Sequence, residues 1–336
     1  MEPDAVRRGE RVHHGGEPDP NVLDFSANVN TRTPDGVEAV YREALSRSRR
    51  YPDDEYPDFR AAAAEYVDCA PEQVIPTPGG LAAIRLAIEV TLEAGDRALV
   101  PAPSFAEYAR EVRLQGAEPE FVAHDRLLDA DPAEYDLAIV CNPNNPTGDA
   151  YDSGALHEFA DGCAAAGTPL LVDEAFLGFT DRPSLAGHEG AIVARSLTKL
   201  FGLPGLRAGF AVATGERRDD LATARRAWNL GTPAAAVGAH CLRDDAFVAE
   251  TRDRVAAERA RLEEALDDRF DVHTSDAPFL LLDCGDRDVD TLLDRARDAG
   301  IALRDARTFR GLDSHIRVAV KDEAANDRLL EVLADG

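Results

Sequence analysis

Between residues 58 and 245, short apolar runs alternate with longer stretches that have a helical pattern. Strands that are apolar throughout, and that are separated by helices, are typical of a parallel sheet covered by helices on both faces. The sequence therefore predicts an α/β fold whose central sheet is mostly parallel. The expected strands are 97–101, 137–141, 169–173, 190–195 and 206–213, and the expected helices among them are 79–94, 105–115 and 153–166.

A second pattern begins near residue 245. A long charged amphipathic helix without glycine or proline is expected over 245–268. After it, strands are expected near 278–283, 301–304 and 315–320, and helices at 288–299 and 322–334. We therefore expect three parts, namely an N-terminal arm packed on the smaller lobe, a large domain and a small α/β domain, over residues 1–45, 46–245 and 246–336.

The chain is strongly acidic. Its 63 aspartates and glutamates exceed its 37 lysines and arginines, which gives a formal charge of −26. This surplus argues against nucleic acid or an anionic membrane surface as the main partner. It suits a salt-adapted, halophile-like surface, because concentrated salt screens self-repulsion. Only two of the basic residues are lysines, Lys199 and Lys321.

The sequence gives no sign of export or membrane insertion. The chain does not open with a basic segment followed by an apolar stretch, and no run approaches 18 apolar residues. The five cysteines are scattered and odd in number, which argues against a disulfide framework or a zinc site. We expect a cytoplasmic protein with reduced thiols and no bound metal.

Two reactive side chains are expected at the ends of strands, where open α/β sheets bind their ligands. Lys199 follows an expected strand, has the hydroxyls of Ser196 and Thr198 nearby in sequence and is followed by Arg207. A lysine in such a setting is a candidate Schiff-base nucleophile next to an anion site. Asp173 ends another apolar run, and a carboxylate there can pair with a protonated pyridine nitrogen.

Two turns complete this pattern. Asn145 lies in the turn 142–148, from which its amide can face a ring oxygen. Gly79, Gly80 and Leu81 open an expected helix, where backbone N–H groups can hold a phosphate. Each feature alone is also what an ordinary turn, cap or surface charge would show. Together and in this order, they predict a site for pyridoxal 5′-phosphate (PLP).

The chain resembles fold-type I PLP-dependent enzymes of the class I/II aminotransferase group. The resemblance rests on N-P-N-N-P-T-G at 142–148, D-E-A-F at 173–176 and S-x-T-K with its later arginine at 196–207, and it extends over nearly the whole chain. Within the group, the threonine-phosphate decarboxylases of cobalamin biosynthesis look closer than the histidinol-phosphate aminotransferases. Phe176 fits the former, because the latter typically carry a tyrosine there. Further similar segments are 14–16, 23–30, 50–56, 304–312 and 315–321.

The resemblance implies a role for each residue of the site. Lys199 is the catalytic residue and carries the cofactor as a Schiff base, while Asp173 faces the pyridine nitrogen and Asn145 faces the ring oxygen O3′. Tyr108 stacks on the ring, and Tyr51 reaches the cofactor phosphate of the neighbouring subunit in a homodimer. The phosphate cradle consists of Gly79, Gly80, Leu81, Ser196, Thr198 and Arg207. Positions 80–82 lack the polar side chain that the family often has there, which leaves more of the binding to backbone amides and Arg207.

A cationic segment near the C-terminus indicates the substrate. Residues 304–317 carry four arginines and two aspartates in a chain with a charge of −26. Arginines suit a substrate with a phosphate and a carboxylate, because they bind both groups in a bidentate manner. For Arg307 and Arg310, a solvated loop with surface ion pairs is the alternative. The expected substrate contacts are His14, Gly15, Asn28, Asn145, Arg304 and Arg317.

The resemblance also implies the reaction. It is the decarboxylation of L-threonine O-3-phosphate to (R)-1-amino-2-propanol O-2-phosphate. The alternative is a histidinol-phosphate or related class I/II aminotransferase, which transfers an amino group to 2-oxoglutarate. The two differ in whether the bond from Cα to the carboxylate or to hydrogen breaks, and the residues leave both open. A non-catalytic member of the fold is disfavoured, because Lys199 and Asp173 are both present.

Overall fold

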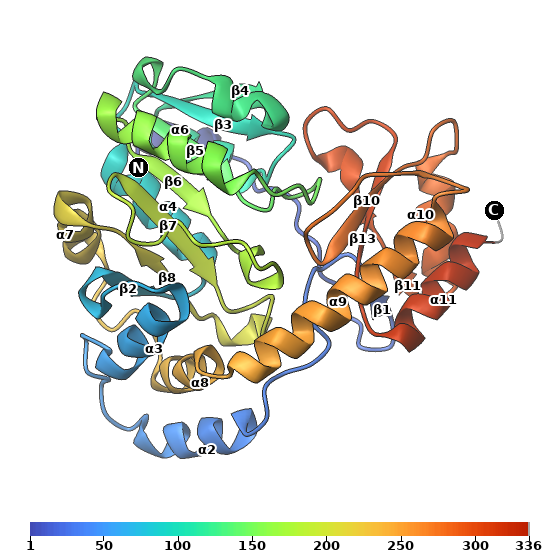
Figure 1. Cartoon of the computed structure of the whole chain (residues 1–336), viewed down its shortest axis with the longest axis horizontal. Coiled ribbons are helices and arrows are strands. Elements are labelled where there is room, and N and C mark those ends of the chain that lie inside the picture. The colour runs from blue at the N-terminus through green and yellow to red at the C-terminus, as the bar shows by residue number, and fades with distance from the viewer. Residues whose placement is uncertain (335–336) are drawn as a thin grey trace.

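The larger lobe of the computed structural model, which describes residues 1–334, is built on a seven-stranded sheet. The strand order is β2-β8-β7-β6-β5-β3-β4 (Figure 1). Neighbouring strands from β7 to β4 are parallel, whereas β8 runs antiparallel to both β2 and β7. The mostly parallel sheet is therefore confirmed. The strands are β2 (Val74–Thr77), β3 (Arg97–Ala102), β4 (Glu118–Ala123), β5 (Leu137–Cys141), β6 (Leu170–Asp173), β7 (Ala191–Ser196) and β8 (Gly209–Val212).

Helices cover both faces of this sheet because successive strand residues point to opposite sides. Val172 of β6 belongs to a core shared with α3 (Pro57–Val67), α6 (Ser153–Ala166) and α8 (Thr232–Leu242). Its neighbour Leu171 belongs to the core on the other side, with α4 (Gly80–Thr91), α5 (Glu107–Leu114) and α7 (Gly215–Ala224). Two separate cores explain why these strands are apolar at every position.

The helix α9 (Asp245–Leu266) connects the two lobes (Figure 1). Its first turn is capped by the Asp244 carboxylate, which accepts a hydrogen bond from the N–H of Phe247. In the smaller lobe, β9 (Asp271–Val272), β10 (Phe279–Asp283), β13 (His315–Ala319) and β12 (Arg304–Asp305) form an antiparallel sheet. The helices α10 (Val289–Asp298) and α11 (Glu323–Ala334) complete this lobe.

The first 45 residues, which were expected to pack on the smaller lobe, contact both lobes. The strand β1 (Leu23–Asp24) pairs with β11 (Ile301–Ala302) of the smaller lobe. In contrast, α1 (Pro3–Arg8) lies against α5, and α2 (Val37–Arg47) packs on α8, both in the larger lobe. The apolar face of α2 explains its position, since it joins the core of that lobe. The domain boundaries at 45 and 245 stay predictions.

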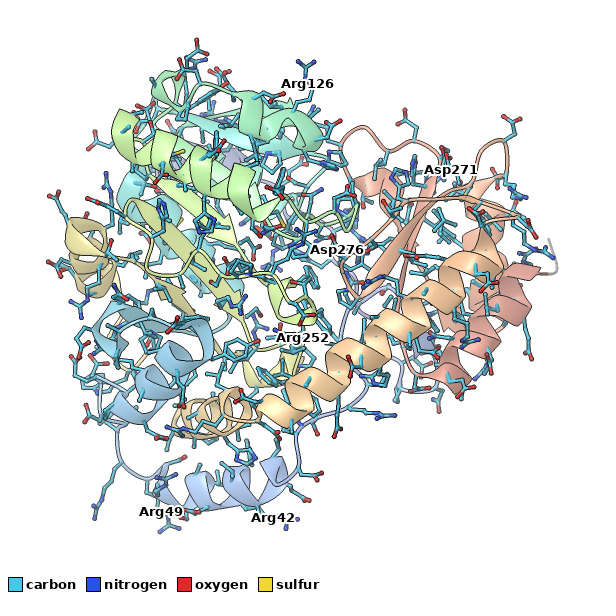
Figure 2. The ribbon with its side chains drawn as sticks, viewed as in Figure 1. Arg42, Arg49, Arg126, Arg252, Asp271 and Asp276 are labelled. Atoms are coloured by element: carbon cyan, nitrogen blue, oxygen red, sulfur yellow. The ribbon has the colours of Figure 1, made fainter. Side chains whose placement is uncertain are left out.

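Polar contacts join the lobes where α9 and the loop before β10 meet the larger lobe. Figure 2 labels Arg252 and Asp276 in this region. The Arg252 guanidinium donates to the carbonyl of Gly178 at 2.9 Å, and Asp276 forms an ion pair of 3.3 Å with Arg182.

Within residues 1–334, none of the helices is both long and apolar enough to span a bilayer.

Candidate active site

The candidate site lies at one edge of the central sheet, where β5, β6 and β7 end. Asp173 is the last residue of β6, and Lys199 follows three residues after β7. Because β8 runs in the opposite direction, its beginning lies at this same edge, and Arg207 just before it is brought to the site. The expected strand from residue 206 is wrong at its start, since Arg207 has a left-handed φ of 54° and the strand begins at Gly209.

A cavity of about 530 Å³ opens at this edge between the two lobes and the N-terminal segment. It brings together most of the residues that the sequence indicated for the cofactor and for the substrate. Five of the predicted or considered residues do not line it: Gly79, Tyr108, Tyr51, Arg307 and Arg310. Those that line it are Gly80, Leu81, Asn145, Asp173, Ser196, Thr198, Lys199, Arg207, His14, Gly15, Asn28, Arg304 and Arg317.

Lys199 lies among other cations in this cavity. Burial, followed by the charges of Arg317, Arg207 and Lys321, lowers the pKa of its amine to about 8. The unprotonated amine, which a nucleophile at a carbonyl carbon requires, is therefore far more abundant near neutral pH than in a lysine with the ordinary pKa of 10.5. Lys199 is thus suited to form a Schiff base.

Asp173 is buried and held by two hydrogen bonds. Its Oδ2 accepts from the Tyr108 hydroxyl at 2.6 Å, and its Oδ1 accepts from the N–H of Ala175 at 3.0 Å. Burial raises the pKa of Asp173, and these two hydrogen bonds oppose that effect. They favour the ionised carboxylate, which is the form that pairs with a protonated pyridine nitrogen.

The expected stacking of Tyr108 on a bound ring is wrong. The side chain is completely buried in the core between α4, α5 and the sheet, and it meets the site only through the bond to Asp173. Phe105, just before α5, lines the cavity instead and packs edge-on against Tyr108, with ring centroids 5.6 Å apart. Sequence reasoning missed Phe105 because Phe105 and Tyr108 are both aromatic and only three residues apart.

The start of α4 forms a tight cradle against β7 and Arg207. A Cβ at Gly79, where φ is 95°, would lie 2.6 Å from Nη2 of Arg207, and a Cβ at Gly80 would lie 2.9 Å from Cβ of Ser196. Ser196 and Thr198 share a hydrogen bond of 2.8 Å between their hydroxyls. Helix N–H groups, two hydroxyls and a guanidinium suit a phosphate, so this cradle fits the phosphate of PLP. Leu81 adds no polar group.

Arg317 lines the same cavity from the smaller lobe. Its Nη1 donates to Oδ1 of Asn145, and its Nη2 donates to the carbonyl of Ser26 at 2.9 Å. Its Nε and the Oδ1 of Asn28 are buried without a hydrogen-bond partner in the described chain. Because buried polar atoms are normally paired, both are available to a bound ligand.

Three further predicted residues lie on the arm side of the cavity. Arg304 donates to the carbonyl of His13 at 3.0 Å, and Nε2 of His14 lies 2.9 Å from Oε1 of Glu107. Gly15 packs directly on the backbone of Ser26, because a Cβ at Gly15 would lie 2.2 Å from the carbonyl oxygen of Ser26. The arm is thus fixed against both lobes beside the cavity.

The structure separates the four arginines of the segment 304–317. Arg304 and Arg317 line the cavity with Lys199, whereas Arg307 pairs with Asp305 and Asp290 and lies outside it. Arg310 also lies outside, with its guanidinium carbon 3.9 Å from the ring centroid of Phe121. For Arg307, the alternative of a surface ion pair is therefore the one observed.

Tyr51 lies away from the cavity of its own chain. It is 80% exposed and packs on Trp228, which is 50% exposed, with ring centroids 4.6 Å apart.

Lys321, in contrast, is buried behind the site. Its Nζ donates to the carbonyls of Ala27 and Val29, both at 3.1 Å, and so holds the backbone on either side of Asn28.

Residues 20–333 match the family described as aminotransferase class I and II, and the chain belongs to this family. It is 31% identical over 329 residues to histidinol-phosphate aminotransferase 2 of Archaeoglobus fulgidus, covering 95% of this chain and 94% of that one. It is 32% identical over 345 residues to threonine-phosphate decarboxylase of Salmonella typhimurium, covering 95% and 92%.

Comparison with solved structures agrees with the fold-type I architecture. A histidinol-phosphate aminotransferase of Sinorhizobium meliloti, solved in complex with pyridoxal-5′-phosphate, superposes with a TM-score of 0.83 at 22% identity, over 99% of this chain and 95% of that one. The class I/II aminotransferase family is PLP-dependent, so PLP is the cofactor. The cradle at α4, Asp173 and Lys199 together provide what its phosphate, ring nitrogen and aldehyde require.

Proposed function

We propose that this protein is a PLP-dependent lyase that decarboxylates L-threonine O-3-phosphate to (R)-1-amino-2-propanol O-2-phosphate, as in cobalamin biosynthesis. The observation that carries the choice is the wall beside Lys199, where Phe176 lines the cavity and no tyrosine does so among residues 1–334. The histidinol-phosphate branch typically places a phenol at this position, and Phe176 cannot supply one. The relative from Salmonella typhimurium supports the same choice.

The cavity has separate groups for each charge of the proposed substrate. We assign the carboxylate to Arg317 and Asn145, which already contact each other, and the phosphate to Arg304 and His14 on the arm side. A guanidinium binds either anion with two parallel hydrogen bonds. Gly15 and Asn28 complete the wall on that side.

Bound PLP withdraws the electron pair that remains at Cα when a bond to this carbon breaks. The carboxylate of Asp173 would pair with the protonated ring nitrogen of bound PLP, and the Tyr108 hydroxyl holds that carboxylate in place. In decarboxylation the bond from Cα to the carboxylate carbon breaks, CO₂ leaves, and the ammonium of Lys199 returns a proton to Cα. The lowered pKa of Lys199 suits this proton transfer.

The second candidate is a histidinol-phosphate or related class I/II aminotransferase. It is supported by the relative from Archaeoglobus fulgidus, and it uses the same Lys199, Asp173 and phosphate cradle. In that reaction Lys199 removes the proton from Cα instead of returning one. The substrate and the bond that breaks distinguish the two candidates.

One assay separates them. The holoenzyme is incubated with L-threonine O-3-phosphate, with and without 2-oxoglutarate, while CO₂ and glutamate are measured separately. The proposal predicts CO₂ release that does not depend on 2-oxoglutarate, and no glutamate. Glutamate without CO₂ would refute the lyase and favour the aminotransferase. A parallel reaction with L-histidinol phosphate serves as the comparison.

We also propose a homodimer in which Tyr51 contacts the cofactor phosphate of the neighbouring subunit. Its 80% exposure and its contact with the exposed Trp228 support a surface that a second copy covers. Mixing Tyr51→Ala and Lys199→Ala chains tests this. A mixed dimer then has one site with both defects and one intact site, so activity should return on mixing. No recovery would place Tyr51 outside the neighbour's site.

The proposal includes a cytoplasmic location. The five cysteines are free thiols, and burial raises the pKa of the Cys141, Cys163 and Cys241 thiols. Buried unpaired thiols are usual in a reducing compartment.

A further inference from the structure

A second cavity adjoins the candidate active site. It has a volume of about 1030 Å³ and lies between α1, α5, β4 and the segment 307–313. Arg11, Phe105 and Phe309 line both cavities, so the two share a wall. A molecule in the outer cavity would therefore lie next to the site that contains Lys199.

Arginines dominate the charged lining of this outer cavity. Arg110 forms ion pairs with Glu107 and Glu111. Arg307 forms ion pairs with Asp290 and Asp305. The other four have no ion pair with an acidic side chain in the described part of the chain: Arg8, Arg11, Arg113 and Arg310. The acidic residues of the lining are Glu2, whose carboxylate caps α1, Glu10 and Asp313.

Phe121 contacts two of these arginines. The guanidinium carbon of Arg310 lies 3.9 Å from its ring centroid, and that of Arg113 lies 5.9 Å away. Burial, followed by the nearby charge of Arg310, lowers the pKa of Arg113. Contact with the aromatic ring stabilises both guanidinium groups. An anion bound to both would reduce the repulsion between Arg113 and Arg310.

We propose that this outer cavity is a second binding site for phosphate-bearing small molecules, with Arg113 and Arg310 on Phe121 as its main contacts and Arg11 on the side of the active site. The class of ligand follows from the arginines, which bind phosphate through two parallel hydrogen bonds. The site acts by direct contact. At long range the net charge of −26 repels an anion, and molar salt screens this repulsion beyond about 3 Å.

Titration of the PLP-loaded enzyme with inorganic phosphate at constant ionic strength tests the site, with binding measured by calorimetry. The double variant Arg113→Gln/Arg310→Gln should weaken one class of phosphate site about tenfold or more, because hydrogen bonds to charged groups are strong. Arg304→Gln, in the inner cavity, should leave that class intact. Arg126→Gln is the matched control, since Arg126 is a largely exposed arginine on the larger lobe, outside both cavities (Figure 2).

Unchanged phosphate binding in Arg113→Gln/Arg310→Gln would overturn the proposal, and so would an equal loss in Arg126→Gln. These readings do not depend on which reaction the enzyme catalyses.

Kinetics with L-threonine O-3-phosphate then identify the ligand. A KM several-fold higher with unchanged kcat in the double variant means that the substrate itself uses the site. Unchanged kinetics with lost phosphate binding mean that a separate phosphate-bearing molecule does.

Discussion

At the scale of single residues, the charge on Lys199 is set by its burial and, after that, by the cations around it. Its ordinary pKa of 10.5 falls to about 8 in the folded chain. Between these values the unfolded chain binds more protons than the folded one, so the stability of the cofactor-free protein rises with pH in this window. Below about pH 8 the amine is charged in both states, and its burial among cations opposes folding in full.

Lys199→Met should therefore stabilise the cofactor-free protein at pH 7, by about 3 kcal/mol. The difference from wild type should shrink as the pH approaches 10.5. Urea unfolding of both proteins at the two pH values, in the same salt, measures it. A wild type that is the more stable protein at pH 7, or a difference that does not change with pH, would contradict this reading of the site.

The hydroxyl of Tyr108 acts on the reaction only through Asp173. Tyr108→Phe removes a hydrogen bond to a charged group, a loss of about 1.5–3 kcal/mol, and it should raise the pKa of Asp173 further. We expect kcat/KM to fall about tenfold or more, with the acid limb of its pH profile moved to higher pH. Steady-state kinetics across pH measure both.

Tyr151→Phe is the control for Tyr108→Phe. Its hydroxyl donates to the carbonyl of His124 at 2.6 Å, and Tyr151 does not line the cavity. This variant should lose stability without a shift in the pH profile. If both variants behave alike, Tyr108 has no specific influence on Asp173.

At the scale of elements, the reversed strand β8 explains how the phosphate cradle is assembled. It brings Arg207 against the start of α4, so that Gly79 has no room for a side chain. Gly79→Ala should weaken PLP binding more than tenfold, because the new Cβ displaces the guanidinium. Fluorescence or absorbance titration of the cofactor-free protein with PLP gives the affinity.

Gly95→Ala provides a matched control. Gly95 has a φ of 98°, close to the 95° of Gly79, but nothing lies within 4 Å of its added Cβ. Both variants place an alanine at a positive φ that favours glycine, and only Gly79→Ala meets Arg207. Equal losses of PLP affinity would mean that strain, and not the cradle, causes the effect.

The sequence predicted the elements that carry a clear pattern. The buried strands β5, β6 and β7 lie close to their expected bounds, and so do α6 and α9, because apolar runs and helical periodicity mark them directly. The same runs place Asp173 and Lys199 at the shared edge of the sheet. The reversed direction of β8 has no local signal, since it depends on which strands it lies between.

Local pattern also fails where two residues of one type compete. Phe105 and Tyr108 are both aromatic, and only the packing of α5 decides which of them lines the cavity. Likewise, Arg304, Arg307 and Arg310 look alike in sequence. Their division between an inner cavity, a surface ion pair and an outer cavity follows from contacts with distant residues such as Asp290 and Phe121.

At the scale of the whole molecule, a charge of −26 makes the fold depend on salt. Self-repulsion between acidic side chains destabilises the compact state, and added salt screens it. We expect the Tm to rise by about 5 °C or more when KCl increases from about 0.1 M to about 2 M. A Tm that is constant or falls over this range would contradict a salt-adapted surface.

Lys199 lies in the site and Lys321 lies behind it, so the structure gives the two lysines different roles. Lys199 lines the cavity, whereas the amine of Lys321 is bound to the carbonyls of Ala27 and Val29. Only a primary amine forms a Schiff base with the cofactor, and arginine cannot replace it. The identity of the lysine that carries PLP is therefore the central claim about this molecule.

Reduction of the PLP-loaded protein with borohydride, followed by peptide mass mapping, tests this claim most directly. Borohydride fixes the cofactor to the lysine that holds it, and the chain has only two lysines. We predict that the pyridoxyl group is found on the peptide with Lys199, that Lys199→Ala abolishes the labelling and that Lys321→Ala leaves it intact. Labelling of Lys321, or labelling that survives Lys199→Ala, would contradict the account.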